Sequence, residues 1–440
     1  MSNTESLKKK LQYLKKNGDL NAKDAKREDN LHRIFMYPGM MVPQAQTLIV
    51  EAITEFLPAN PWVIDPFMGA GTSLLSCMEF GFNVFGQDIN PFAVLLTKAK
   101  TITYDIDALN HSYNNIKKWV SADNKQTIDV NFKGIDKWFK KDIQRDLSKI
   151  RRAIQNIDSK DLRCFFWIVF SEVIRTGSND RTSTYKLHQR TIENINGREV
   201  NIISNFYVLC ERGIKDFKDF KMKLESKRLI NNNHYVNAIS TVWGNSMKFI
   251  NTEQKFDILV SSPPYGDNHT TVTYGQHSYL ELQWIDKADL SEDIDYDFLK
   301  TTQEIDSQSL GGKINSKQIN EIFDGIVERI PSLRKFFSKI PSSEYKKYYK
   351  TIAFISDFEK SLDNILQVMN RNAYYVWTIG NRRVAKREIP NNTILIDLME
   401  ERDIKLVYTA ERSILNKKQP NKNNYSKTME KEHILIFHNK

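Results

Sequence analysis

The stretch Ser262-Pro263-Pro264-Tyr265 follows directly after the apolar run FDILVS, which predicts a buried strand. The Ser262 hydroxyl and the Pro263 carbonyl are hydrogen-bond acceptors, and each proline fixes φ and removes a competing backbone donor. Two fixed acceptors can hold the protons of an amino group out of the plane of a conjugated ring, which makes its nitrogen more nucleophilic. Tyr265 offers a face on which a flipped base can stack. The stretch therefore predicts a site that activates the exocyclic amine of a nucleobase.

A second motif, DPFMGAGTS at residues 65–73, joins a short apolar strand to a helix. Its two glycines, Gly69 and Gly71, permit a sharp turn and the close approach of a ligand. Asp88 ends the next strand, NVFGQD, where its carboxylate can accept hydrogen bonds from ribose hydroxyls. This series of strand, glycine turn, helix, strand and acid indicates a nucleoside cofactor. The third glycine of the dinucleotide motif is missing, since Ser73 or Leu74 stands in its place, which disfavours NAD.

Alternating helix and strand patterns surround both motifs and predict a doubly wound, mostly parallel sheet. Only a loop separates the last two predicted strands, IKLVYTA and EHILIFH, so one of them is expected to run antiparallel. The part between the motifs is mostly helical, and it predicts an insertion or a second domain. The expected organisation is a flexible basic N-terminus at 1–28, a first part of the sheet domain at 29–103, a helical insertion at 104–237, and a second part at 238–440 with an inserted segment at about 286–349.

Composition narrows the class of protein. The net charge of +10 favours a polyanionic partner. The sequence contains no apolar run long enough to span a bilayer and no signal peptide with an apolar h-region, so we expect a cytoplasmic protein without a membrane partner. The three cysteines, Cys77, Cys164 and Cys210, form no metal-binding pattern, which predicts a reducing compartment and no metal.

Taken together, DPFMGAGTS, GQDINPFA (86–93) and VSSPPYGDN (260–268) resemble the cofactor and catalytic motifs of amino-methylating DNA methyltransferases. The serine of SPPY resembles the cytosine-N4 subgroup in particular. The segment FMYPGMMVPQ (35–44) resembles the part of that family that holds the methionine moiety of the cofactor. The resemblance implies a class I methyltransferase-like fold and S-adenosyl-L-methionine as cofactor.

The resemblance also implies roles for individual residues. In the family a Gly-Asp pair follows the strand before the catalytic one, and here VWGNSMKF puts Asn245 in place of the acid. The implied catalytic residues are Ser262, Pro263, Pro264 and Tyr265. The implied cofactor-binding residues are Tyr37, Pro38, Asp65, Pro66, Phe67, Gly69, Gly71, Thr72, Asp88, Ile89, Asn90, Asn245 and Ser246.

Two basic stretches are candidate contacts to the DNA backbone. RTSTYKLH contains Arg181, Lys186 and His188, and GNRRVAKRE contains Arg382 and Arg383. A solvated basic turn is the alternative explanation of the first stretch. Whether the helical insertion, the 286–349 segment or both read the target sequence stays open.

These patterns favour a site-specific methyltransferase that modifies N4 of a flipped cytosine in double-stranded DNA. The resemblance adds a cognate restriction endonuclease as functional partner and a prokaryotic cytoplasm, close to the nucleoid, as location. Cytosine-C5 chemistry is disfavoured, because it uses a cysteine, typically in a Pro-Cys pair, and no proline precedes a cysteine here. The alternatives are adenine-N6 methylation, methylation of an amino group in RNA, and a catalytically silent DNA-binding protein on the same scaffold.

Overall fold

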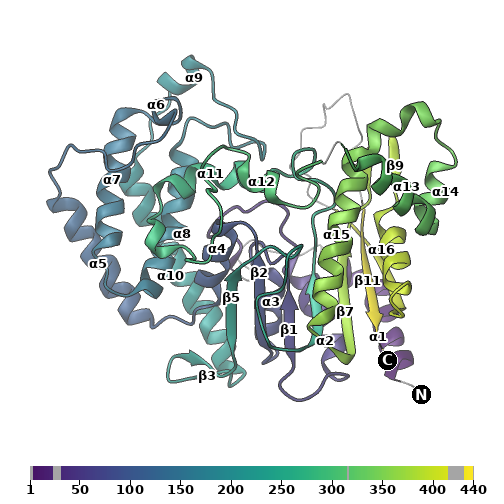
Figure 1. Cartoon of the computed structure of the whole chain (residues 1–440). Coiled ribbons are helices and arrows are strands. Elements are labelled where there is room, and N and C mark those ends of the chain that lie inside the picture. Colours follow the sequence, from purple (N-terminus) through teal and green to yellow (C-terminus); the bar gives the residue numbers. More distant parts are fainter. Residues whose placement is uncertain (1–2, 23–30, 315–316, 415–430, 440) are drawn as a thin grey trace.

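A seven-stranded sheet organises the chain, as the computed structural model shows for residues 3–22, 31–314, 317–414 and 431–439 (Figure 1). Five adjacent strands, from β7 to β5, run parallel, whereas β11 is antiparallel to both of its neighbours. The predicted α/β sheet with an antiparallel strand near its C-terminal end is thereby confirmed. The order in space is β10 (Lys405–Ser413), β11 (Lys431–His438), β7 (Met369–Ile379), β6 (Phe256–Ser261), β1 (Trp62–Asp65), β2 (Asn83–Asp88) and β5 (Ile239–Trp243).

The central strands are apolar on both faces because helices cover both sides of the sheet. Alternate residues of β6 belong to two different cores: Val260 faces one and Leu259 the other, and both are fully buried. On the first face lie α2 (Pro43–Thr54), α3 (Thr72–Met78) and α4 (Pro91–Thr101). On the second lie α13 (Ile319–Arg329), α14 (Pro331–Phe337), α15 (Tyr349–Gln367) and α16 (Asn391–Glu400).

The segment between α4 and β5 builds a helical lobe beside the β5 edge of the sheet, on the left of Figure 1. Its centre is α8 (Lys160–Gly177), which is buried almost all round, as its apolar sequence predicts. The other elements of the lobe are α5 (Ile106–Ala122), α6 (Ile135–Trp138), α7 (Lys141–Gln155), α9 (Ile192–Asn196), α10 (Ile202–Ser226), and the short strands β3 (Ile230–Asn231) and β4 (His234–Tyr235).

After β6 the chain returns to this lobe before it completes the sheet. Helix α11 (Tyr274–Trp284) packs against α8, with Leu282 and Trp284 in the core. It is followed by η3 (Lys287–Asp289), α12 (Glu304–Gln308), and then α13, α14 and η4 (Ser342–Tyr348). A hairpin of β8 (Arg382–Val384) and β9 (Arg387–Ile389) follows β7.

The N-terminal segment differs from the flexible region that we expected at 1–28. Residues 3–22 contain α1 (Asn3–Asn17) and η1 (Asp19–Asn21), which pack against α2 and β10. The expectation was wrong for these residues because Leu7 and Leu11, four residues apart, form a buried stripe among the many lysines. The low-complexity stretch 416–427 lies outside the described residues. Among those that are described, no helix is both long and apolar enough to cross a membrane.

Candidate active site

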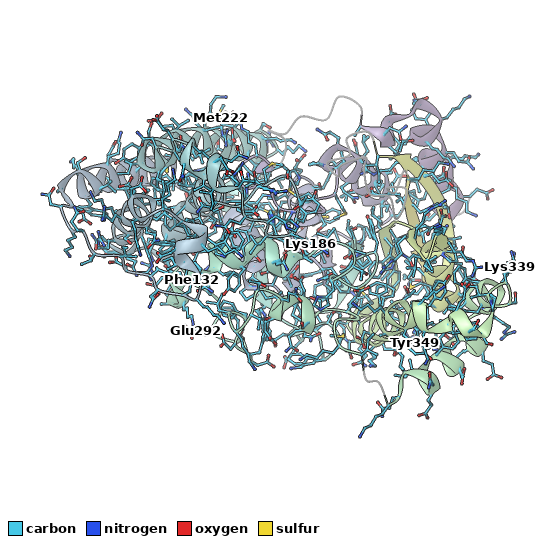
Figure 2. The ribbon with its side chains drawn as sticks, turned by 90° about the horizontal axis from the view of Figure 1, so that it is seen from above. Phe132, Lys186, Met222, Glu292, Lys339 and Tyr349 are labelled. Atoms are coloured by element: carbon cyan, nitrogen blue, oxygen red, sulfur yellow. The ribbon has the colours of Figure 1, made fainter. Side chains whose placement is uncertain are left out.

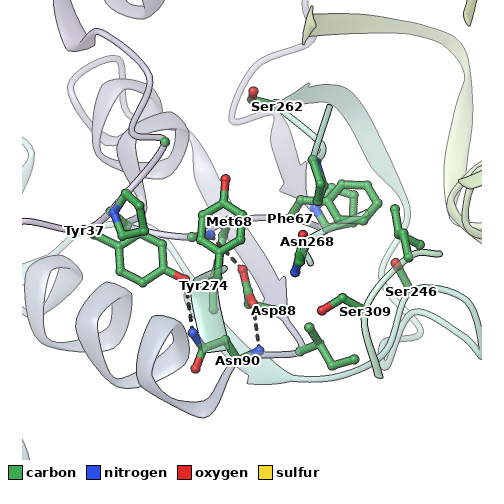
Figure 3. Close-up of a pocket in the computed structure, with 18 of the residues that line it drawn as sticks. Tyr37, Phe67, Met68, Asp88, Asn90, Ser246, Ser262, Asn268, Tyr274 and Ser309 are labelled. Atoms are coloured by element: carbon green, nitrogen blue, oxygen red, sulfur yellow. Dashed lines mark hydrogen bonds between the residues drawn. The ribbon is translucent and has the colours of Figure 1, made fainter. Parts of the chain in front are cut away.

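A pocket lies where the parallel strands β6, β1, β2 and β5 end, and it encloses about 830 Å³ of space that protein atoms do not fill, including open solvent (Figure 3). The residues that follow each of these strands form its walls. In Figure 3 the rings of Tyr37 and Tyr274 lie on one side, and Phe67, Ser246 and Ser309 on the other. All the cofactor residues expected from the sequence line this pocket except Asp65 and Gly71.

The glycine turn after β1 is shaped by backbone geometry that only glycine adopts easily. Gly71 has φ 74°, and a Cβ atom there would stand 2.7 Å from Cγ2 of Thr97. Helix α4 supports the turn from below, since Thr97 Oγ1 donates to the Gly69 carbonyl (2.8 Å) and Lys100 Nζ to the Ala70 carbonyl (2.7 Å). Gly71 therefore shapes the pocket without lining it.

Asp65 is fully buried beneath the turn and does not reach the pocket surface. Its carboxylate accepts hydrogen bonds from Phe67 N (3.0 Å), from Ser261 Oγ (2.6 Å) and from Ser73 Oγ. Burial raises the pKa of Asp65 to about 6, against the effect of these three donors. Asp65 therefore links the glycine turn after β1 to the end of β6.

Asp88, at the end of β2, faces the pocket. Its two carboxylate oxygens accept from Gly69 N (2.9 Å) and Asn90 N (2.8 Å), which fixes the side chain against the glycine turn. Burial raises the pKa of Asp88 to about 6. A carboxylate has about four acceptor positions, so the backbone donors do not use all of them and a ligand hydroxyl can still be accepted.

Asn90 links Asp88 to the side of the pocket that Tyr37 and Tyr274 form. Its Oδ1 caps α4 by accepting from Phe92 N (3.0 Å), and its Nδ2 donates to the Tyr37 hydroxyl (3.2 Å) and to Ser278 Oγ (3.0 Å). Tyr37 in turn stacks on Tyr274, with ring centroids 5.7 Å apart. The segment 35–44 is thus fastened to the carboxyl end of β2.

Several residues that line the pocket were missed from the sequence. Tyr274 comes from α11, and Ser309 and Leu310 come from the inserted segment after α12. Asp306 of α12 accepts from Gly275 N (2.9 Å) and Gln276 N (3.1 Å), so it holds the start of α11 in place. No local motif marks these positions, although the aromatic residues of VTYGQHSYLELQW (272–284) are a signal that could have indicated Tyr274.

Asn245 and Ser246, which follow β5, both line the pocket. Asn245 Oδ1 accepts from Met247 N (3.0 Å), an arrangement that makes a turn after the strand. Ser246 Oγ donates to Ser361 Oγ (3.0 Å) on α15.

The SPPY residues divide between the pocket and its surroundings. Ser262 and Pro264 line the pocket, whereas Pro263 lies in a separate small cavity beside Phe354 and Phe358. The Tyr265 hydroxyl lies 3.2 Å from Ser262 Oγ and donates to Glu432 Oε1 (3.1 Å) on β11. Burial raises the pKa of Tyr265 well above its usual value, so its hydroxyl keeps its proton at neutral pH.

The basic loop 181–190 is docked on the start of α11. Thr273 Oγ1 donates to the Tyr185 carbonyl (2.9 Å), and Lys186 Nζ to the His269 carbonyl (3.4 Å). Arg181, Lys186 and His188 are all exposed. Figure 2, which looks down on the molecule, places Lys186 between the part that carries Phe132 and the part that carries Tyr349.

The two arginines of the β8–β9 hairpin differ in their environment. Arg382 is 12% exposed and pairs with the buried Asp267 (3.1 Å), and it also donates to Thr270 Oγ1 (2.8 Å). It therefore braces the loop that follows Tyr265. Arg383 is 41% exposed and its nearest charged partner, Glu388, is 3.9 Å away.

The strand order, with its single antiparallel strand, and the pocket over β1 and β2 define a class I methyltransferase-like fold. The chain is 31% identical over 426 residues to the type II methyltransferase M.MvaI of Kocuria varians, a match that covers 93% of this chain and 91% of that protein. The chain therefore belongs to the type II methyltransferase family.

Two further similarities are shorter or more distant. Type II methyltransferase M.MjaII of Methanocaldococcus jannaschii is 38% identical over 86 residues, which cover 20% of this chain and 16% of that protein. Among solved structures, the rRNA methyltransferase aviRa of Streptomyces viridochromogenes has a TM-score of 0.35 and 7% identity, with 94% of this chain and 93% of that one covered. No protein-family model matches the chain.

Proposed function

We propose that this protein transfers a methyl group from S-adenosylmethionine to N4 of a flipped-out cytosine, at a specific short sequence in double-stranded DNA. The observation that supports this most directly is the Ser262 hydroxyl on the wall of a pocket suited to a nucleoside. Membership of the type II methyltransferase family supports DNA as the substrate and a role beside a restriction endonuclease in the cytoplasm.

The residues of the pocket fit the proposed cofactor. The free acceptor positions of Asp88 suit the ribose hydroxyls. The amide of Asn245, in place of the usual acid, can accept from the exocyclic amine of an adenine. Phe67, Met247 and Leu310 supply apolar surface for the ring, and Tyr37 and Pro38 lie where the methionine moiety is expected.

When bound, S-adenosylmethionine supplies an electrophilic methyl group whose carbon–sulfur bond breaks as the carbon–nitrogen bond forms, leaving S-adenosylhomocysteine. The chain would prepare the nitrogen. Ser262 Oγ and the Pro263 carbonyl would accept hydrogen bonds from the two N–H groups of the amine, which draws the nitrogen lone pair out of conjugation with the ring. Tyr265 contributes its ring as a stacking surface for the flipped base. After transfer the methylated nitrogen would carry a positive charge and release one proton to the solvent, to which the pocket is open.

DNA would lie over the carboxyl edge of the sheet, between the helical lobe and the β8–β9 hairpin. Arg181, Lys186 and His188 would contact the phosphates from one side and Arg383 from the other. Arg382 would act mainly by holding the loop after Tyr265, because Asp267 already engages it.

The test is a transfer reaction on mixed-sequence duplex DNA with methyl-labelled S-adenosylmethionine, followed by digestion to nucleosides and mass spectrometry. We expect the label in N4-methyldeoxycytidine, and a strongly reduced but measurable rate of labelling in the Ser262→Ala variant. Label in N6-methyldeoxyadenosine would replace cytosine by adenine as the target. Cofactor binding without any label in DNA would refute the proposed reaction and favour an RNA substrate or a silent scaffold.

A further inference from the structure

The hydroxyl of Tyr265 lies between two oxygen atoms that come from distant parts of the chain. On one side Ser262 Oγ is 3.2 Å away, and on the other Glu432 Oε1 is 3.1 Å away. Glu432 is the second residue of β11, and because β11 runs antiparallel to β7, its first residues lie at the edge where β6 ends. The topology of the sheet therefore brings this acid to the SPPY residues.

Arg412 holds Glu432 in this position. The two residues face each other across the β10–β11 pair. The Arg412 Nε and Nη2 atoms are 2.7 Å and 2.6 Å from Glu432 Oε2, and the two side chains are 8% and 14% exposed. The guanidinium thus occupies one carboxylate oxygen and leaves the other for Tyr265.

The direction of the hydrogen bonds follows from the donors that are available. The carboxylate of Glu432, paired with Arg412, can only accept hydrogen bonds. The Tyr265 hydroxyl therefore uses its single proton to donate a hydrogen bond to Glu432. The Tyr265 oxygen can then only accept from Ser262, whose proton points toward it. Both lone pairs of Ser262 Oγ are left free, and Ser262 lines the pocket.

We propose that Glu432 is a positioning residue that, through Tyr265, turns Ser262 into an obligate hydrogen-bond acceptor for the amino group of the target base. A serine hydroxyl without this arrangement can equally turn its proton toward the amine, which would repel the N–H groups that it must attract. The inference rests on the proposed function, and it adds an acid that no SPPY motif contains.

The test compares Glu432→Gln with Tyr265→Phe, which keeps the stacking ring and removes only the hydroxyl. In Glu432→Gln the amide oxygen will face Arg412, so its NH₂ group will donate to Tyr265 and force the tyrosine proton toward Ser262. We expect kcat to fall roughly 10- to 100-fold in both variants, the loss typical of one hydrogen bond to a charged group. KM for DNA and for S-adenosylmethionine should stay within about twofold of wild type, as should cofactor affinity.

The matched control is Glu411→Gln on the neighbouring strand, where the carboxylate pairs with Lys431 and does not contact Tyr265. It should leave kcat unchanged. A double-mutant cycle separates positioning from folding: in the Ser262→Ala background, Glu432→Gln should cost almost nothing further, because the hydroxyl that it orients is gone.

The possible outcomes separate this inference from the proposed function. If the wild-type protein transfers methyl groups and both Glu432→Gln and Tyr265→Phe keep its kcat, the proposed role of Glu432 is overturned. It is also overturned by losses that track a lowered Tm, or that multiply fully with the loss in Ser262→Ala, since these indicate a structural role. Absence of methyl transfer by the wild-type protein would instead refute the proposed function, and the inference with it.

Discussion

Asp88 is the residue for which the structure predicts the sharpest division between stability and cofactor binding. At neutral pH its ionised carboxylate is disfavoured by burial, because its pKa rises from 3.8 to about 6. This rise of the pKa corresponds to a cost of about 3 kcal/mol for holding the ionised carboxylate in the folded state. The neutral variant Asp88→Asn escapes this cost, but its NH₂ group must face Gly69 N or Asn90 N and leave that donor unpaired, which costs about 1–3 kcal/mol.

These two effects offset each other, so we expect the free energy of unfolding of Asp88→Asn to stay within about 2 kcal/mol of wild type. Cofactor affinity should change much more. Hydrogen bonds from ribose hydroxyls to a charged acceptor contribute about 1.5–3 kcal/mol, so the Kd for S-adenosylmethionine should rise roughly 10- to 100-fold. At saturating cofactor, kcat should remain within a few-fold of wild type.

The assay is isothermal titration calorimetry with S-adenosylmethionine, combined with urea unfolding and with kcat at saturating cofactor. Asp257→Asn is the matched control. Asp257 also accepts from a backbone N–H, that of Trp62 (2.9 Å), but it lies near the start of β6, at the end of the parallel strands opposite the pocket. This variant should lose stability without a change in Kd. An unchanged Kd in Asp88→Asn, together with a large loss of kcat, would refute the assignment of Asp88 to the ribose.

Four further predictions follow from the same geometry. Replacing Tyr265 by alanine should lower kcat by about 100-fold or more, since stacking and hydroxyl orientation are lost together, while the cofactor Kd, measured by calorimetry, stays within about twofold. Gly71→Ala should destabilise the protein by about 2 kcal/mol or more in urea unfolding, because it combines a left-handed φ of 74° with a close contact to Thr97. Lys186→Ala should weaken DNA binding about equally for all sequences and reduce the salt slope by about 1 in filter binding, whereas the remote Lys339→Ala should not. The folded state keeps the proton of Asp65 up to about pH 6, whereas the unfolded chain keeps it only up to about pH 3.8. The free energy of unfolding of wild type, relative to that of Asp65→Asn, should therefore fall as the pH rises from 4 to 6, by at most about 3 kcal/mol.

Each of these has an outcome that contradicts it. A cofactor Kd that rises as much as kcat falls in Tyr265→Ala would place the ring in the cofactor site. A wild-type stability for Gly71→Ala would mean that the turn can relax, and a sequence-dependent loss in Lys186→Ala would indicate base contact. A pH-independent difference between wild type and Asp65→Asn would show that Asp65 is not protonated in this range.

The local motifs determined the core of the site. The residues from Asp65 to Asn90 lie on consecutive elements, and each requirement is local: a glycine where φ is positive, an acid at a strand end, and an apolar run for a buried strand. The periodicity of the later strands likewise predicted the sheet. The loop between the last two predicted that one of them runs antiparallel, and the structure shows that this strand is β11.

Only the tertiary structure determined the remaining partners. Tyr274, Asp306 and Glu432 come to the site from segments far from the motifs. The sequence around them does not indicate which residues they contact in the folded protein. Their placement depends on which elements are neighbours in space and in which direction each one runs. Glu432 meets Tyr265 because β11 enters the sheet antiparallel, which brings its first residues to the edge where the parallel strands end. The same holds for α1, whose Leu7 and Leu11 become a buried stripe only when α2 and β10 are present to cover them.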